Sequence, residues 1–231
     1  MLYNNDMTTL FKCPAEFGES SYVIPSSVVT IGDNAFYSCD LENIEIGENV
    51  ITIGDEAFAW NNFINIKIPN SVTNIGDNAF YYCDSLENIE LGENVITIGD
   101  GAFSDCQSLS NITLTKNVKH LGEKIFEYCW ELKAINVDLD NNYFKSDSNG
   151  VLYNKDMTTL IKCPDNFQES SYEIPDSVLT IGKYAFESCS SLENIKIGEN
   201  VTTIGEEAFS GTSLTSIKIP NSIITIGDYA F

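Results

Sequence analysis

Apolar and polar positions recur along this chain with a nearly fixed period. The motif Ile/Leu-Gly-x-x-Ala/Ile-Phe occurs eight times, and successive glycines are 22, 22, 23, 23, 60, 23 and 22 residues apart. The motif glycines are Gly32, Gly54, Gly76, Gly99, Gly122, Gly182, Gly205 and Gly227. Between them the text reads Leu-x-x-Ile-x-Ile, then Gly-Glu-Asn or Pro-Asn-Ser, then Val-x-x-Ile-Gly. Such a period predicts a stack of similar coils and not one globular core.

Each coil contains signals for a strand, a corner and a turn. In the Ile-x-Ile step, Ile44 and Ile46 face one way while Asn43 and Glu45 face the other, which predicts a strand with one buried face. Glycine or proline follows and predicts a corner, at Gly47, Gly92, Gly198, Pro25, Pro69, Pro175 and Pro220. The Gly-x-x-Ala-Phe step predicts a short helical or 3₁₀ turn whose Ala and Phe fill the interior.

These elements together predict a repeat solenoid. A parallel β-sheet forms one face, and short strands and 3₁₀ or helical turns form the other. Because one coil cannot bury its apolar side chains alone, we expect coils to stack about 4.8 Å apart around a continuous column of Leu, Ile, Val and Phe.

One gap interrupts the period. Its 60 residues equal one 23-residue coil and 37 further residues, and the extra text, residues 138–172, predicts a β-hairpin insert around 152–160. The segment Leu2–Leu10 repeats Leu152–Leu160 at an offset of 150, so residues 1–22 are predicted to be a partial hairpin segment. We expect residues 1–231 to be a single solenoid domain excised from a longer array.

A second regular position lies three residues after the motif Phe. Small side chains able to hydrogen-bond occupy it: Cys39, Asn61, Cys83, Cys106, Cys129, Cys189 and Thr212. We call these the ladder residues, and we expect them to point inward and to bond backbone groups left free by the turn. No Cys-x-x-Cys pair occurs, and parallel Cβ vectors suit a disulfide poorly, so buried free thiols are favoured over disulfides or a metal site.

These patterns resemble the BspA-type leucine-rich repeat family, whose coils read Leu-x-x-Ile-x-Ile-Pro-x-Ser-Val-x-x-Ile-Gly-x-x-Ala-Phe-x-x-Cys. Residues 109–129 follow that text, with Thr115 in place of Pro and Ile125 in place of Ala. The resemblance covers nearly the whole chain. It implies a leucine-rich repeat solenoid displayed on a cell surface, which binds host or neighbouring-cell proteins.

Composition narrows the possible partners. Twelve basic and 34 acidic residues leave a formal charge of −22, which disfavours nucleic acid and anionic membrane surfaces. Apolar runs are far shorter than the roughly 20 residues that cross a bilayer, and no secretion signal opens the chain, so no membrane insertion is expected.

Candidate catalytic and metal-binding groups are sparse. The one histidine, His120, is expected on the surface, and carboxylates recur at equivalent places on every coil instead of converging. Residues 138–142 begin like a calcium loop, but Tyr143 and Asn149 stand where glycine and a bidentate Glu belong. We therefore predict no enzyme activity, no cofactor and no metal.

The outward strand positions are the best candidates for binding, because they line one continuous surface. We call them the strand face: Asn43, Glu45, Asn65, Lys67, Asn88, Glu90, Asn111, Thr113, Asn136, Asn194, Lys196, Ser216 and Lys218. Stacked Asn and mixed charges also stabilise a sheet surface without binding anything. The leading interpretation is a non-catalytic protein-binding or adhesion module, at the cell surface or secreted as part of a longer protein. The alternative is a cytoplasmic protein-interaction scaffold.

Overall fold

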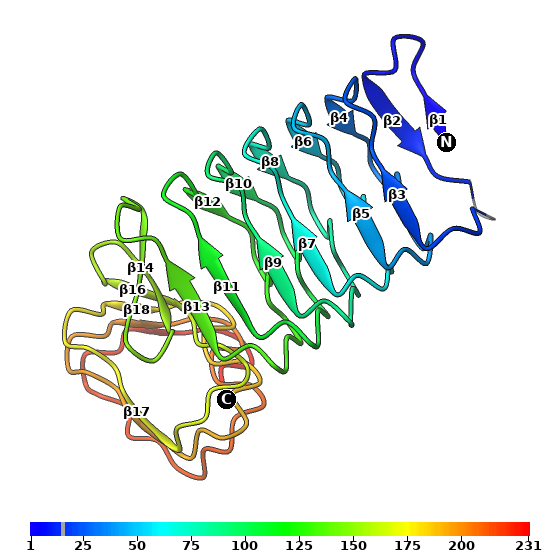
Figure 1. The fold of residues 1–231 in the computed structure, drawn as a ribbon. Coiled ribbons are helices and arrows are strands. Elements are labelled where there is room, and N and C mark those ends of the chain that lie inside the picture. The colour runs from blue at the N-terminus through cyan, green and yellow to red at the C-terminus, as the bar shows by residue number, and fades with distance from the viewer. Residues whose placement is uncertain (15–16) are drawn as a thin grey trace. The chain divides into compact units, whose positions relative to one another are not determined.

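The computed structural model describes residues 1–14 and 17–231 and divides the chain into two compact units, Met1–Trp130 and Glu131–Phe231 (Figure 1). Both units consist of short strands and turns wound into coils, and the described residues form no helix. The solenoid class predicted from the repeats is confirmed. A single continuous domain stays a prediction.

The first unit contains two sets of short strands. In one, each strand pairs with its equivalent one coil away, in parallel and in register, as Thr30 does with Thr52 and Thr52 with Asn74. Its members are β2 (Thr9–Lys12), β4 (Thr30–Ile31), β6 (Thr52–Ile53), β8 (Asn74–Ile75), β10 (Thr97–Ile98) and β12 (His120–Leu121), with β1 (Leu2–Tyr3) antiparallel to β2. The strands of the Ile-x-Ile step lie along another side of the coils (Figure 1): β3 (Ser21–Val23), β5 (Asn43–Glu45), β7 (Asn65–Lys67), β9 (Asn88–Glu90) and β11 (Asn111–Leu114). Here β3 pairs with β5, and β9 pairs with β7 and β11, all in parallel.

The second unit repeats this scheme after an antiparallel segment. The pairs β14–β15 and β15–β16 are antiparallel, whereas β16–β18–β20–β21 and β17–β19 are parallel. The strands are β13 (Ala134–Val137), β14 (Phe144–Ser146), β15 (Leu152–Asn154), β16 (Thr159–Lys162), β17 (Ser171–Glu173), β18 (Thr180–Ile181), β19 (Asn194–Lys196), β20 (Thr203–Ile204) and β21 (Thr225–Ile226).

The antiparallel pairs β1–β2 and β15–β16 have the same construction in both units. Tyr3 faces Leu10 and Tyr153 faces Leu160, each beside the same register shift. In each turn one asparagine Oδ1 accepts hydrogen bonds from two backbone N–H groups. Asn4 accepts from Thr8 and Thr9, and Asn154 accepts from Thr158 and Thr159. The two segments that repeat in sequence at an offset of 150 residues therefore also share the same local structure.

The core is an apolar column through the coils. In the first unit the rings of Phe36, Phe58, Phe80 and Phe103 stack nearly parallel, with centroids 5.3 to 5.5 Å apart. The same rings are fully buried. Offset stacking of this kind adds about 0.5–1.5 kcal/mol per pair beyond the area buried, so the motif Phe joins each coil to the next.

The prediction of helical or 3₁₀ turns after the motif glycine is wrong. In these segments alternate N–H groups donate to the next coil, as Asn34 N–H does to Asp55 O and Phe36 N–H to Ala57 O. Asn34 has a φ of 56°, in the left-handed region, and equivalent residues of other coils share that conformation. Because these N–H groups are committed between coils, they cannot make the bonds of a helix within one coil.

The ladder prediction is confirmed. The thiols of Cys83, Cys106 and Cys129 each donate to the carbonyl of the motif Phe one coil earlier, at 3.1 to 3.3 Å. All seven cysteines are buried free thiols. Burial raises the pKa of the Cys83 thiol to about 12, because the thiolate would have to form away from water.

Coil length varies at one place, directly after the ladder residue. In 23-residue coils the following Leu is three residues beyond it, and Leu86 N–H bonds Cys83 O at 3.0 Å. In the first 22-residue coil that spacing is one residue shorter, and Leu41 N–H instead donates to the side-chain oxygen of Asn61 at 2.9 Å. Asn61 is therefore the ladder residue that also supplies an acceptor.

Candidate functional site

The strand face is exposed as the alternation of side chains requires. All thirteen predicted residues are solvent-exposed, while Ile66, Ile89 and Ile112 between them are buried against the core. Eight of the thirteen lie in the first unit, two on each of β5, β7, β9 and β11. The alternation of the strands is enough to place these eight residues on the outer side, because successive side chains of a strand point to opposite sides.

In the first unit the face is ordered by register. Asn65 is opposite Asn88, and Asn88 is opposite Asn111, so the asparagines form one column. Asn88 Nδ2 donates to Asn65 Oδ1 at 2.9 Å. Lys67 is opposite Glu90, so charges of opposite sign are neighbours in the next column. The first column holds amide donors and acceptors in a fixed order, and the second holds one pair of neighbouring opposite charges, Lys67 and Glu90.

A shallow depression of about 320 Å³ lies over β7, β9 and β11. Its polar lining consists of Asn65, Asn88, Glu90, Asn111 and Thr113, all predicted from the sequence. The structure therefore brings five predicted residues to one place. They can offer hydrogen bonds to a partner, and none of them is arranged as a nucleophile beside a base.

In the second unit the face is less extensive. Asn194 and Lys196 lie on β19 and face Ser171 and Glu173 of β17. Lys196 Nζ contacts Glu173 Oε1 at 2.5 Å, and that carboxylate raises the pKa of the lysine. Glu173 was missed from the sequence, although the Ile174-Pro175 corner after it is the signal that ends the other strands.

Three other predicted residues of this unit are not brought together with that pair. Asn136 is exposed on β13. Ser216 and Lys218 are exposed but lie outside any strand, which corrects their assignment to a strand column. The reason is that in the described chain residues 214–219 share no backbone ladder with β19, and a strand exists only through such bonds.

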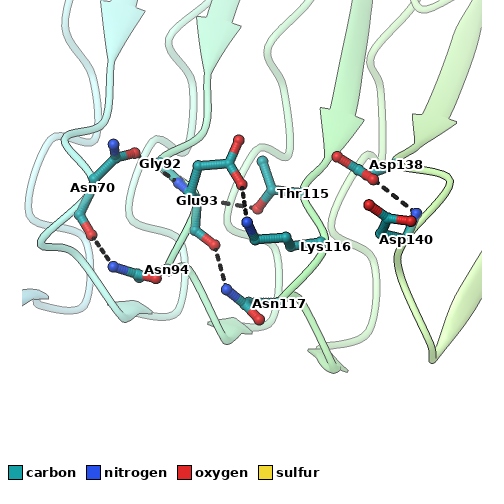
Figure 2. A network of polar contacts seen from close by, with 9 residues as sticks. All are labelled: Asn70, Gly92, Glu93, Asn94, Thr115, Lys116, Asn117, Asp138 and Asp140. Atoms are coloured by element: carbon teal, nitrogen blue, oxygen red, sulfur yellow. Dashed lines mark hydrogen bonds and ion pairs between the residues drawn. The ribbon is translucent and has the colours of Figure 1, made fainter.

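The corner beyond the strand face is a network of polar contacts between coils (Figure 2). Asn94 Nδ2 donates to Asn70 O at 2.9 Å, and Asn117 Nδ2 donates to Glu93 O at 2.8 Å. Glu93 N–H bonds Asn70 Oδ1, and its carboxylate lies 3.3 Å from Lys116 Nζ. The Glu and Asn of the Gly-Glu-Asn sequence at this corner thus form hydrogen bonds to the neighbouring coil.

The calcium-like text at 138–142 forms local turns. Asp138 Oδ1 accepts the Asp140 N–H at 2.8 Å (Figure 2). Asn141 Oδ1 accepts the N–H groups of Tyr143 and Phe144. These side-chain oxygens therefore accept hydrogen bonds from backbone N–H groups. Among the described residues no group of three or more His, Cys, Asp or Glu side chains is placed to hold a metal ion.

His120 lies exposed on β12. No helix in the described part of the chain is long and apolar enough to cross a membrane.

Comparison with known proteins agrees with this architecture. The chain is similar to the pneumococcal vaccine antigen PcpA, with 26% identity and a TM-score of 0.81, over 95% of this chain and 62% of that one. It is also similar to a leucine-rich repeat protein from Eubacterium ventriosum, with 28% identity and a TM-score of 0.66, over 95% of this chain and 53% of that one. A leucine rich cell surface protein from Faecalibacterium prausnitzii has 28% identity and a TM-score of 0.68, over 92% of this chain and 70% of that one.

The chain spans less than two thirds of the length of the first two of these proteins. No curated protein matches it. A family model for the BspA type leucine-rich repeat region, six copies long, matches residues 16–133, 73–174 and 164–231. Since these matches extend over most of the sequence and the coils have the expected strands, corners and ladder, the chain belongs to the BspA-type leucine-rich repeat family.

Proposed function

We propose that this chain is a non-catalytic, protein-binding module of a longer cell-surface protein, and that the strand face of the first unit is its binding surface. The observation that carries the proposal is the register of β7, β9 and β11, which brings a column of asparagines and the charge of Glu90 to one depression. Surface display is supported by the Faecalibacterium prausnitzii relative, described as a leucine rich cell surface protein, and by the pneumococcal relative, described as a vaccine antigen.

The chemistry of the face favours a polar protein surface as its partner. Asparagine carboxamides can donate and accept at once, which matches backbone and side-chain amides of a protein. Charges of both signs occur side by side in the neighbouring column, so this face offers no single-sign field to a uniformly charged polymer.

The proposal is tested by reversing one charge at the centre of the face. Glu90→Arg should weaken binding to a protein partner by about tenfold or more, because it places a bulky cation beside Lys67 and at the edge of the depression. The measurement is biolayer interferometry of the purified chain against a panel of purified extracellular-matrix proteins.

The matched control is Glu48→Arg. It makes the same change of charge at an exposed residue of the corner, outside the strand face. Equal losses in both variants, or no loss in Glu90→Arg with its circular dichroism intact, would contradict the strand-face proposal. Absence of any binding across the panel would count against a matrix adhesin.

The second candidate function is a cytoplasmic interaction scaffold. Seven buried free thiols favour it, because proteins in oxidising compartments usually pair their cysteines. Protease treatment of intact cells separates the two functions. Degradation of the chain under conditions that spare a cytoplasmic marker supports surface display, and protection of the chain supports the scaffold.

A further inference from the structure

Exposed aromatic side chains gather on another side of the first unit, away from the Ile-x-Ile strands. This side is formed by the turn segments that follow the motif glycines. It carries the exposed rings of Tyr37 and Trp60 and the half-buried rings of Tyr81 and Tyr82. The ring of Trp60 stacks on Tyr82 with centroids 3.9 Å apart, and Tyr81 approaches Trp60 edge-on at 6.1 Å. Trp60 is still 40% exposed and Tyr37 37% exposed. The core does not use these faces, so they are available to a partner.

A hollow of about 500 Å³ opens beside these rings because one coil has small residues there. Gly101 stands where the preceding coils carry Glu56 and Asn78, and Ser104 stands where the preceding coil carries Tyr81. The hollow is therefore lined by aromatic rings from earlier coils and by the charged residues of the coil that follows.

Negative charge dominates the lining. Glu56, Asp100, Glu123 and Glu127 contribute carboxylates, while the lining's lysine, Lys124, lies 2.6 Å from Glu127. Asp105 is close by, and its pKa is raised by burial and by the charge of Glu127. The carboxylates outnumber the cation, so an added positive charge would be favoured there.

The chain already uses an aromatic ring of this group beside a cation. Lys12 Nζ lies 6.0 Å from the centre of the Tyr37 ring, within the range of a cation–π contact. The same ring also lines the hollow.

We propose that this hollow, the aromatic pocket, binds an arginine or lysine side chain presented by a protein partner. The cation would stack on the Trp60 and Tyr81 rings and pair with the surrounding carboxylates, as planar guanidinium groups do on aromatic faces. Aromatic rings alone would also suit a sugar; the excess of carboxylates is what selects a cation. This binding site is separate from the strand face and goes beyond the function proposed for it.

The test compares two peptides that differ in charge but hardly in shape: acetyl-Gly-Arg-Gly-amide and its citrulline counterpart. The chain has two tryptophans, so its ¹⁵N spectrum contains two indole signals, which Trp60→Leu and Trp130→Leu assign. The arginine peptide should shift the Trp60 signal saturably and bind at least fivefold more tightly than the citrulline peptide. Sodium chloride should weaken the binding, because the attraction is partly Coulombic.

The matched variants make the same change at two exposed tryptophans. Trp60→Leu should weaken arginine-peptide binding at least fivefold, read from other shifted amides. Trp130→Leu should leave it unchanged, because Trp130 lies outside the pocket lining. Trp60→Phe retains an aromatic face and should lose less than Trp60→Leu.

Equal affinity for the two peptides, or an unchanged affinity in a folded Trp60→Leu variant, would overturn the proposal. A shift of Trp60 by maltohexaose but not by the arginine peptide would also overturn it, in favour of a sugar site. Glu90→Arg should not alter the arginine-peptide affinity, so the pocket and the strand face can fail independently.

Discussion

The glycine of the Ile/Leu-Gly-x-x-Ala/Ile-Phe motif fits closely against the backbone of the neighbouring coil. A Cβ added at Gly205 would lie 2.5 Å from Lys183 N and 2.6 Å from Gly182 C, closer than real carbon contacts allow. The corner glycines differ among themselves: a Cβ at Gly198 would meet its nearest atom at an ordinary 3.6 Å, whereas a Cβ at Gly92 would lie 2.3 Å from Pro69 O. Lack of space for a Cβ therefore accounts for the glycine at Gly205 but not for the glycine at Gly198.

Two alanine substitutions in one coil test this distinction. Gly205→Ala should lower the free energy of unfolding by about 3 kcal/mol, because the methyl group must displace backbone atoms that cannot rotate away. Gly198→Ala should leave it unchanged or raise it by about 0.5 kcal/mol, since it restricts the unfolded chain. Urea unfolding followed by circular dichroism measures both; similar losses would contradict a steric origin.

The side chain of one ladder residue, Asn61, compensates for the residue that the first 22-residue coil lacks after Cys39. Asn61 is buried, donates to Phe36 O and Phe58 O, and accepts from Leu41 N–H. A cysteine there could replace the donor, as Cys83 does one coil later, but not the acceptor.

Substitutions at Asn61 should therefore rank by the bonds they leave unmade. Asn61→Ala should lower the free energy of unfolding by about 3 kcal/mol, because it leaves the Leu41 N–H and the Phe36 and Phe58 carbonyls without this hydrogen-bond partner. Asn61→Cys should cost roughly half as much. Thermal and urea unfolding give the order. As a control, inserting a serine between Asp40 and Leu41 recreates the text of residues 83–86, and it should reduce the cost of Asn61→Cys; no reduction would contradict the compensating role.

The turn segments also show what periodicity could and could not predict. The columns of the strand face, the corners and the inward ladder follow from residue spacing, because alternation and stacking determine where side chains point. The left-handed turns could not be predicted as such, since Gly-x-x-Ala-Phe suits a helical turn equally well until N–H groups are committed to the next coil. The aromatic pocket escaped notice because its signal is a departure from the repeat, the small pair Gly101 and Ser104.

Over the whole molecule, the buried thiols couple stability to pH. Burial raises the pKa of Cys83 to about 12 and that of Cys106 and Cys163 well above the ordinary value. A thiol whose folded pKa is raised contributes stability that is fully present below the unfolded pKa, near 9, and is lost as pH rises toward 12. Between these two pKa values the cysteine thiols ionise in the unfolded chain while they stay protonated in the folded chain.

The urea midpoint should therefore fall between pH 9 and pH 11, with each such thiol contributing about 1.4 kcal/mol per pH unit. Cys83→Ser keeps a donor for the Phe58 carbonyl but does not titrate, so its pH dependence should be shallower by about one proton. A midpoint that stays level from pH 8 to pH 11 would show that the thiolates are not excluded from the folded state.

Coil-to-coil bonding also has a mechanical consequence. Each coil is held by its neighbours through short ladders and a ring stack, and among the described residues no single element runs the length of a unit. Under tension such a unit yields one coil at a time, and each 22-residue coil can release about 75 Å of extended chain. Because the strand face is built from the same coils, a pulled unit would keep the columns of its intact coils while the loosened ones absorb the load.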